Sequence, residues 1–445
     1  MLNEPTMKQI MEIITMKYIK EERWMDVQVS ASGAIAALVV AIVLILRKVP
    51  PAYGMIAGAF VGGMVSGVNV ADTVAVMMDG AKGMVPAILR ILAAGVLAGV
   101  LIESGAAASI AETIVQKFGE TRALLALAVA TLLLTAIGVF IDVAVITVAP
   151  IALAIAGRAG LAKTAILLAM IGGGKAGNIM SPNPNAIAAA DAFHVPLTSL
   201  MAAGMIPAAF GLIVTYVIAK KLARKGTLVY DVPEREKSGQ VLPSFFTAII
   251  GPLVAILLLA LRPLFHIAVD PMIALPIGGI VGAIAMQKGK ELNDYAISGL
   301  AKMSGVAIML VGTGTLAGIV ANSSLKDAII AGLDHSGLPA YVLAPIAGIL
   351  MSGATASTTA GTAVASSVFG GMIMSLGISA LAGAAMVHAG ATVLDHLPHG
   401  SFFHATAGSV HMEIKERLKL IPYESLIGLT LAVISTLIFG MFRLF

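Results

Sequence analysis

The chain contains no cysteine and few charged residues, and each shortage excludes a class of protein. Without cysteine there is no disulfide framework and no thiolate metal site. Charged residues make up only 12% of the 445 residues, whereas 58% are hydrophobic, and the mean hydropathy is +0.97. A water-soluble domain cannot bury so much apolar surface. The composition therefore predicts an all-α polytopic membrane protein in contact with the lipid bilayer.

The remaining charge gives no support to nucleic-acid binding or to ATP-driven transport. The formal net charge is +4, but the basic residues lie in loops between apolar runs. No Walker motif is present, and no motif calls for a cofactor. We expect no nucleic-acid partner and no cofactor.

Apolar runs bounded by charge, glycine and proline predict the order of the segments. Residues 1–29 resemble an interfacial amphipathic helix, because lysines and Trp24 surround a few apolar positions. Two transmembrane repeats follow at 30–219 and 243–445, separated by a charged connector at 220–242. Each half is expected to hold five full crossings and one re-entrant hairpin. The predicted apolar segments are 30–46, 52–68, 83–102, 122–156, 162–190, 197–219, 243–261, 271–287, 303–321, 339–377, 379–400 and 423–442.

The two halves also share a short stretch of similar sequence. The sequence GVLAGV at 95–100 matches GTLAGI at 314–319, an offset of 219 residues that is about half the chain. An odd number of crossings in each half makes the repeats inverted. Most lysines and arginines then fall on the face that carries the connector, which predicts that the connector is cytoplasmic. Internal duplication with interrupted helices is typical of secondary transporters.

The first interrupted helix contains GGGKAGNIMSPNPN at 172–185. Proline removes a backbone donor, and glycine costs about 1 kcal/mol relative to alanine in a helix. Irregular backbone at membrane depth is tolerated only where it is buried in protein or lines a watery cavity. We therefore expect a break with open backbone and a binding site for an anion at these residues: Gly173, Gly174, Lys175, Asn178, Ser181, Asn183 and Asn185.

Asp142 is isolated from other charges, since none lies between Arg122 and Arg158 apart from it. An ionisable group at that depth indicates function by default. Burial penalises its charged form, which makes Asp142 a candidate proton carrier. The alternative to proton transfer is a structural role, in which Asp142 pairs permanently with Arg90 or Lys175.

The second half offers a matching pair of segments. A hydroxyl-rich interruption, SGATASTTAGTA at 352–363, carries four candidate ligands for a carboxylate or polyol: Thr355, Ser357, Thr358 and Thr359. Such residues also pack helices in membranes. The segment VHAGATVLDHLPHGSFFH at 387–404 adds His388 and His396 as substrate ligands, with Asp395 and His388 as further proton-coupling candidates. A metal site is the less favoured interpretation of these histidines, and we predict no metal.

These motifs are similar to those of a known family. The sequence GVFIDVAVITVAPIAL at 138–153 resembles the region of gluconate permeases in which an acid follows glycine and aromatic or apolar residues. The breaks and the inverted halves resemble the wider ion transporter superfamily. The resemblance implies proton symport of a hydroxylated monocarboxylate across the inner membrane by a homodimer. Asn183 stands between two prolines where gluconate carriers tend to have histidine, so the acid itself stays open.

The sequence thus predicts an importer of a gluconate- or glycerate-like sugar acid, driven by protons. A sodium-coupled carboxylate or citrate carrier is the alternative within transport. An intramembrane enzyme that uses Asp142, Asp395 and the histidines is the alternative from another class.

Overall fold

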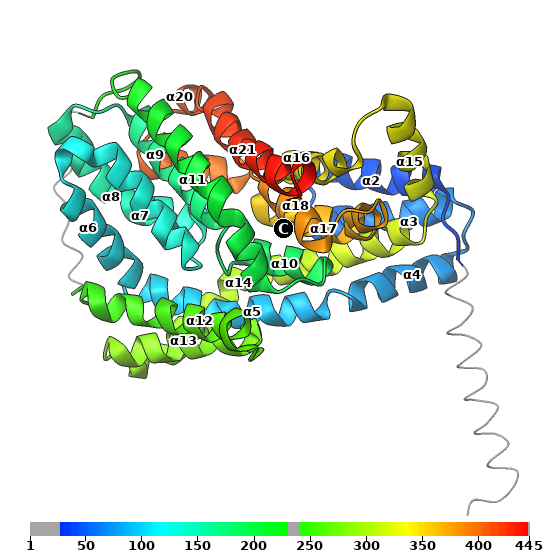
Figure 1. Ribbon diagram of the computed structural model, residues 1–445, viewed down its shortest axis with the longest axis horizontal. Coiled ribbons are helices and arrows are strands. Elements are labelled where there is room, and N and C mark those ends of the chain that lie inside the picture. The colour runs from blue at the N-terminus through cyan, green and yellow to red at the C-terminus, as the bar shows by residue number, and fades with distance from the viewer. Residues whose placement is uncertain (1–26, 230–240, 444–445) are drawn as a thin grey trace, which may run out of the picture. The chain divides into compact units, whose positions relative to one another are not determined.

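The computed structural model describes residues 27–229 and 241–443, and within them the chain is helical (Figure 1). No strand forms in this part of the chain, where the β contacts are two isolated bridges. The all-α prediction is confirmed. The predicted amphipathic segment 1–29 lies almost entirely outside the described residues, as does the middle of the connector.

Helices long and apolar enough to cross a membrane occur in both halves of the chain. Six of them are found among the described residues: Val85–Glu103, Ile141–Ala159, Leu197–Lys221, Phe245–Phe265, Gly289–Ala321 and Ile414–Met441. The chain is therefore a multi-pass membrane protein.

The chain divides into two compact units. The smaller unit comprises Met1–Met84 and Val311–Gly337. Its helices α2 and α3 pack through small residues, with Gly58 and Gly62 of α3 close to Ala37 of α2. The helices of this unit are α2 (Ala31–Leu46), α3 (Pro51–Val65), α4 (Val70–Lys82), the end of α14 (Leu292–Ala321) and α15 (Leu325–Ser336).

The larger unit comprises Val85–Leu310 and Leu338–Phe445 and holds every residue of the candidate site. Its first-half helices are α5 (Val85–Glu103), α6 (Ala106–Phe118), α7 (Ala123–Ala136), α8 (Ile141–Ala159), α9 (Lys163–Asn178), α10 (Pro184–Ala192) and α11 (Leu197–Lys221). Its second-half helices, besides the start of α14, are α12 (Phe245–Phe265), α13 (Pro271–Ala285), α16 (Leu343–Thr355), α17 (Thr358–Ser375), α18 (Ala380–Gly390), α19 (Ser401–Ser409), α20 (Ile414–Leu418) and α21 (Ile421–Ser435), and α21 continues as a π-helix at Thr436–Met441.

Most predicted segments match these helices within a few residues, while α14 begins earlier than predicted and several helices, α4 and α6 among them, fall outside the predicted apolar segments. Residues 70–82 form α4, which no predicted segment covers because Asp72, Asp79 and Lys82 interrupt its apolar residues. Helix α14 begins at Leu292 rather than near 303, since its polar first turns continue the helix. Helix α6 also lies outside those segments, and it buries one face, which includes Ile110 and Ile114.

The glycine run also differs from the prediction. Residues 172–174 and 177 lie inside helix α9, so the break is confined to 179–183. Gly173 lies against the backbone of Ala128 and Gly177 against that of Leu132, both on α7. A side chain at either glycine would collide with that backbone. The glycines therefore serve close helix packing rather than open backbone.

Helix starts in the second half follow those of the first at nearly the predicted offset. Helix α6 begins at Ala106 and α15 at Leu325, while α7 begins at Ala123 and α16 at Leu343. Helix α3 begins at Pro51 and α13 at Pro271. The order of long, short and interrupted helices is therefore similar in the two halves.

Candidate functional site

Four interrupted helix pairs of the larger unit meet around one cavity of about 140 Å³. The interruptions are residues 137–140 between α7 and α8, 179–183 between α9 and α10, 356–357 between α16 and α17, and 391–400 between α18 and α19. We call these the four breaks. The cavity is lined by Phe140, Ile141, Asp142, Asn178, Asn185, Ala356, Ser357, Thr358, Thr359, Asp395, Ser401 and Phe402.

Local sequence explains why the helices stop where they do. Gly138 has a φ of +104°, which suits glycine, and Pro184 starts α10 at a position where its missing N–H costs nothing. Ala356 adopts a left-handed φ of +47° and ends α16. Ser357 then caps α17, its Oγ accepting a hydrogen bond from the Ala360 N–H at 3.2 Å. A left-handed alanine is uncommon, and such residues concentrate at functional sites.

Helix N-termini face the cavity. Asp142 and Asn185 are the second residues of α8 and α10, Thr358 is the first of α17, and Ser401 is the first of α19. The first N–H groups of a helix have no partner inside it, and the helix dipole places positive charge there. The backbone of the cavity therefore favours an anion.

The asparagines at the second break are oriented by capping. Asn183 Oδ1 accepts a hydrogen bond from the Ala186 N–H at 2.9 Å, so its Nδ2 donates to the Asn178 carbonyl at 2.8 Å and to Asn178 Oδ1 at 2.5 Å. That arrangement leaves Asn178 Nδ2 buried without a hydrogen-bond partner in the described structure. Asn178 lines the cavity, so an amide group without a partner among the described residues belongs to the cavity wall.

The second and third breaks are joined directly. Thr359 Oγ1 donates to Asn185 Oδ1 at 2.6 Å, although the residues lie 174 positions apart in the chain. Both line the cavity, so hydroxyl and amide groups from the two halves share one wall.

Behind the cavity, Lys175 forms a fully buried ion pair with Asp395. Lys175 Nζ lies 2.6 Å from Asp395 Oδ1, 2.6 Å from the Thr392 carbonyl and 3.0 Å from His396 Nδ1. Lys175 is 0% exposed and Asp395 2%. The three donors of the ammonium are thus all used, and the structure does not leave Lys175 open to a substrate carboxylate, contrary to the expectation from sequence.

His396 extends this network away from the cavity. If Nδ1 accepts from Lys175, the ring proton sits on Nε2, which lies 3.1 Å from the Ile421 carbonyl and can donate to it. The other carboxylate oxygen of Asp395 accepts from Thr358 Oγ1 at 2.5 Å, and both residues line the cavity. The cavity therefore contacts a charge-compensated carboxylate rather than a free cation.

Asp142 differs from Asp395 because no basic side chain of the described residues forms an ion pair with it. Its Oδ1 accepts a hydrogen bond from the Val143 N–H at 2.9 Å. Arg90 pairs with Asp191 and Asp270, and Lys175 pairs with Asp395, so neither of the two basic residues expected in the structural alternative pairs with Asp142.

The other predicted site residues do not reach the cavity. Gly173 and Gly174 lie within α9, and Thr355 Oγ1 donates to the Met351 carbonyl of its own helix at 2.8 Å. Ser181 and His388 are buried, with side-chain polar atoms that have no partner in the described structure. His388 is 1% exposed on α18.

Sequence reasoning missed the apolar part of the lining. Phe140, Ile141 and Phe402 border the cavity, and each lies within two residues of a predicted polar group or break. An aromatic residue beside a helix break was the available signal. The described residues bring together no three acidic or histidine side chains in a metal-ligand arrangement.

Comparison with known proteins identifies a family. Residues 29–442 match the model of the GntP family permeases. An uncharacterized transporter of Haemophilus influenzae is 69% identical over 415 residues, covering 93% of this chain and 99% of that protein. The high-affinity gluconate transporter of Escherichia coli is 21% identical, and the match covers 88% of this chain and 94% of that transporter.

Solved structures support the fold. The YdaH transporter of Alcanivorax borkumensis, described as having an unusual topology, aligns with a TM-score of 0.61 at 17% identity, covering 82% of this chain and 87% of its own. MtrF of Neisseria gonorrhoeae aligns with a TM-score of 0.58 at 15% identity, covering 83% of this chain and 84% of its own.

Proposed function

The chain belongs to the GntP permease family, and from this premise we propose that it imports a small hydroxylated monocarboxylate together with protons. The family and its relatives are transporters, so the intramembrane enzyme is set aside. Bacterial relatives place the protein in the inner membrane. The observation that carries the proposal is the convergence of four helix breaks on one polar cavity.

The substrate class follows from the groups at the cavity. Helix N-termini and the Asn178 amide suit a carboxylate, while Ser357, Thr359 and Asn185 suit the hydroxyls of a gluconate- or glycerate-like acid. Phe140 and Phe402 supply apolar surface for the carbon chain. Lys175 acts indirectly, by holding Asp395 and through it Thr358.

Charge balance supports proton coupling. Lys175 compensates Asp395, but a bound carboxylate would add its charge to that of Asp142 in the same small cavity. Like charges at short range disfavour each other strongly in a partly buried site. A proton on Asp142 removes this repulsion, so substrate and proton bind together. Sodium coordinated by the cavity oxygens is the alternative, and uptake driven by a sodium gradient alone would favour it.

Matching glycine contacts in the two halves of the chain support inverted repeats as the basis of alternating access. In the larger unit, Gly95 of α5 lies against Gly299 and Gly99 lies against Tyr295. In the smaller unit, Gly314 lies against Gly80 and Gly318 against Val76. Gly95 and Gly99 lie 219 positions before Gly314 and Gly318, while Gly299 and Tyr295 lie 219 positions after Gly80 and Val76. The two pairs of contacts therefore correspond, with the two halves of the chain exchanged. That reciprocity is the pattern expected of two repeats related by a two-fold axis, and we include a homodimer in the proposal from the family resemblance.

Ligand binding tests the proposal. We expect glycerate or gluconate to raise the melting temperature of the purified protein, because a ligand that binds only the folded state stabilises it. Lactate, citrate and succinate serve as comparison acids. Asn178→Ala should weaken binding of the effective acid by about tenfold or more, since a hydrogen bond to a charged group contributes about 1.5–3 kcal/mol.

Asn322→Ala is the matched control, because Asn322 belongs to the smaller unit and donates to the Gly318 carbonyl. It should leave the affinity unchanged. Equal affinities of Asn178→Ala and the parent protein would remove Asn178 from the site. No stabilisation by any hydroxylated monocarboxylate would overturn the substrate class.

A further inference from the structure

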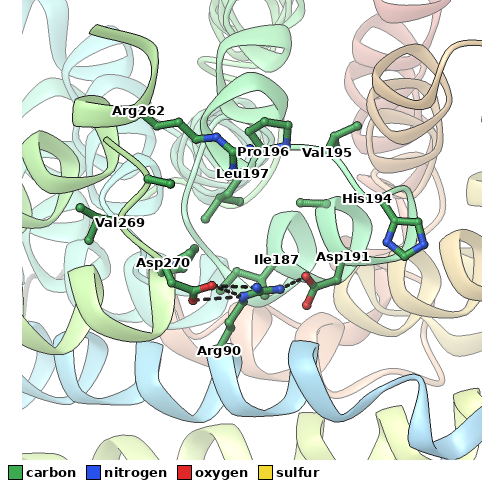
Figure 2. Close-up of a pocket in the computed structure, with 13 residues that line it drawn as sticks. Arg90, Ile187, Asp191, His194, Val195, Pro196, Leu197, Arg262, Val269 and Asp270 are labelled. Carbon is green, nitrogen blue, oxygen red and sulfur yellow. Dashed lines mark hydrogen bonds and ion pairs between the residues drawn. The ribbon is translucent and has the colours of Figure 1, made fainter. Parts of the chain in front are cut away.

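A second cavity, of about 420 Å³, lies at the opposite end of α10 from the candidate site. Helix α10 carries Asn185 in its first turn, at the site, and Asp191 in its last turn. Ile187, Ala190 and Asp191 line the second cavity together with Arg90 of α5 and Asp270, the residue before α13 (Figure 2). The helix has only nine residues, so a restraint at one end fixes the position of the other.

The second cavity lies on the side of the membrane away from the connector. The loops that line it join α10 to α11 and α12 to α13. Helix α11 runs from this loop to the connector, and α12 runs from the connector back to the cavity. A cytoplasmic connector therefore places this cavity on the outer face.

Arg90 lies between two acids and binds them unequally, as Figure 2 shows. Its Nε lies 3.1 Å from both oxygens of Asp270, and its Nη2 lies 2.7 Å from Asp270 Oδ2. Asp270 is fixed further because its Oδ1 accepts the Met272 N–H at 2.8 Å and caps α13. The bond to Asp191 uses Nη1 and one carboxylate oxygen only.

The unequal bonding makes the Asp191 contact the weaker one. Asp191 Oδ2 is buried and has no hydrogen-bond partner in the described structure. The side chains of Arg90 and Asp191 are 28% and 20% exposed, so water in the cavity can solvate both groups once they part. Separating such a pair costs less than separating a fully buried pair such as Lys175 and Asp395.

The rest of α10 packs mainly against helices other than α5 and α13. Phe193 follows α10 directly, is 0% exposed, and lies against Gly370 of α17 and Gly383 of α18. Helix α10 also packs along α17 and, less extensively, against α5. The Arg90–Asp191 pair adds an ionic contact to α5, and Asp270 links the same arginine to the start of α13, which packs against α5.

We propose that Asp191 and Arg90 form a releasable ion-pair latch that positions the site helix α10 against α5 and α13, and that the pair opens during each transport cycle. Both are positioning residues, since they act on the ligand through α10 and Asn185. Asp270 keeps Arg90 on the α5 side when Asp191 leaves. The inference rests on the proposed function only in that a transporter must move its binding-site helices.

Hydrogen–deuterium exchange of the full chain tests the latch without any substrate. Amides of 184–192 should exchange at least about tenfold faster in Asp191→Asn and in Arg90→Gln than in the parent protein, while amides of α12 keep their parent rates and report intact folding. Asp191→Glu, which retains the carboxylate, should return exchange to within about threefold of the parent. Asp294→Asn is the matched control, because it also removes one carboxylate from the larger unit, at an exposed position in the first turn of α14, and it should leave exchange at 184–192 at the parent rate.

Transport then separates positioning from a purely structural role. In proteoliposomes supplied with labelled gluconate or glycerate, Asp191→Asn should change turnover at least about threefold and leave KM within about twofold. Parent-like exchange at 184–192 in both Asp191→Asn and Arg90→Gln would overturn the latch. A change in KM with unchanged turnover would overturn it as well. Because exchange is measured without ligand, a wrong substrate assignment leaves the exchange result valid.

Discussion

Lys175→Ala is expected to lower the free energy of unfolding by about 3–5 kcal/mol, the range for removing one partner of a buried ion pair. The substitution leaves Asp395 buried with only Thr358 and its neighbour His396 nearby. It also leaves a cavity in place of the lysine side chain. Denaturant titration of the purified protein in detergent micelles measures the effect.

A second substitution separates the destabilisation caused by the uncompensated charge from that caused by lost packing. Adding Asp395→Asn to Lys175→Ala removes the uncompensated charge and keeps a hydrogen-bonding group for Thr358. We expect the double variant to be more stable than Lys175→Ala by about 1–3 kcal/mol. Lys163→Ala is the matched control on the same helix, since the Lys163 ammonium donates to the His411 carbonyl and forms no ion pair within the described residues. Equal stability of Lys175→Ala and Lys163→Ala would contradict the buried pair.

Asp142→Asn is expected to abolish accumulation of substrate against its gradient. The amide has nearly the size of the carboxylate and can still accept from the Val143 N–H, but it cannot take up and release a proton. The variant should therefore bind the acid and exchange external for internal substrate. Counterflow and net uptake measured in the same proteoliposomes distinguish these activities.

Asp294→Asn controls for the loss of an acid, because Asp294 lies exposed in the first turn of α14. It should accumulate substrate like the parent protein. If Asp142→Asn still concentrates substrate, Asp142 is not the proton carrier, and Asp395 becomes the next candidate.

The breaks were predictable because they depend on local chemistry. Pro182 and Pro184 interrupt a helix because proline lacks the backbone N–H, and Asn183 favours a cap. The hydroxyl-rich residues at 355–359 act differently, because their side chains compete for backbone hydrogen bonds. The sequence also indicated Asn178, Asn185, Ser357 and Thr359 as ligands, and the structure places all four at one cavity. Their roles in binding remain a prediction.

Long-range pairing was not predictable from one sequence. Lys175 and Asp395 are 220 residues apart, and nothing near either residue indicates the other. Glycine in a membrane helix can open the backbone or allow close packing, and only the position of α7 decides for Gly173 and Gly177. Arg90 illustrates the same limit, since both of its acidic partners lie at least 100 residues away.

Uptake of labelled gluconate and glycerate into proteoliposomes, with a pH gradient or a sodium gradient imposed separately, tests the central claim most directly. The account predicts that an inwardly directed proton gradient alone drives accumulation of at least one of these acids above its external concentration, and that a sodium gradient alone does not. Accumulation that requires sodium and ignores the pH gradient would contradict it.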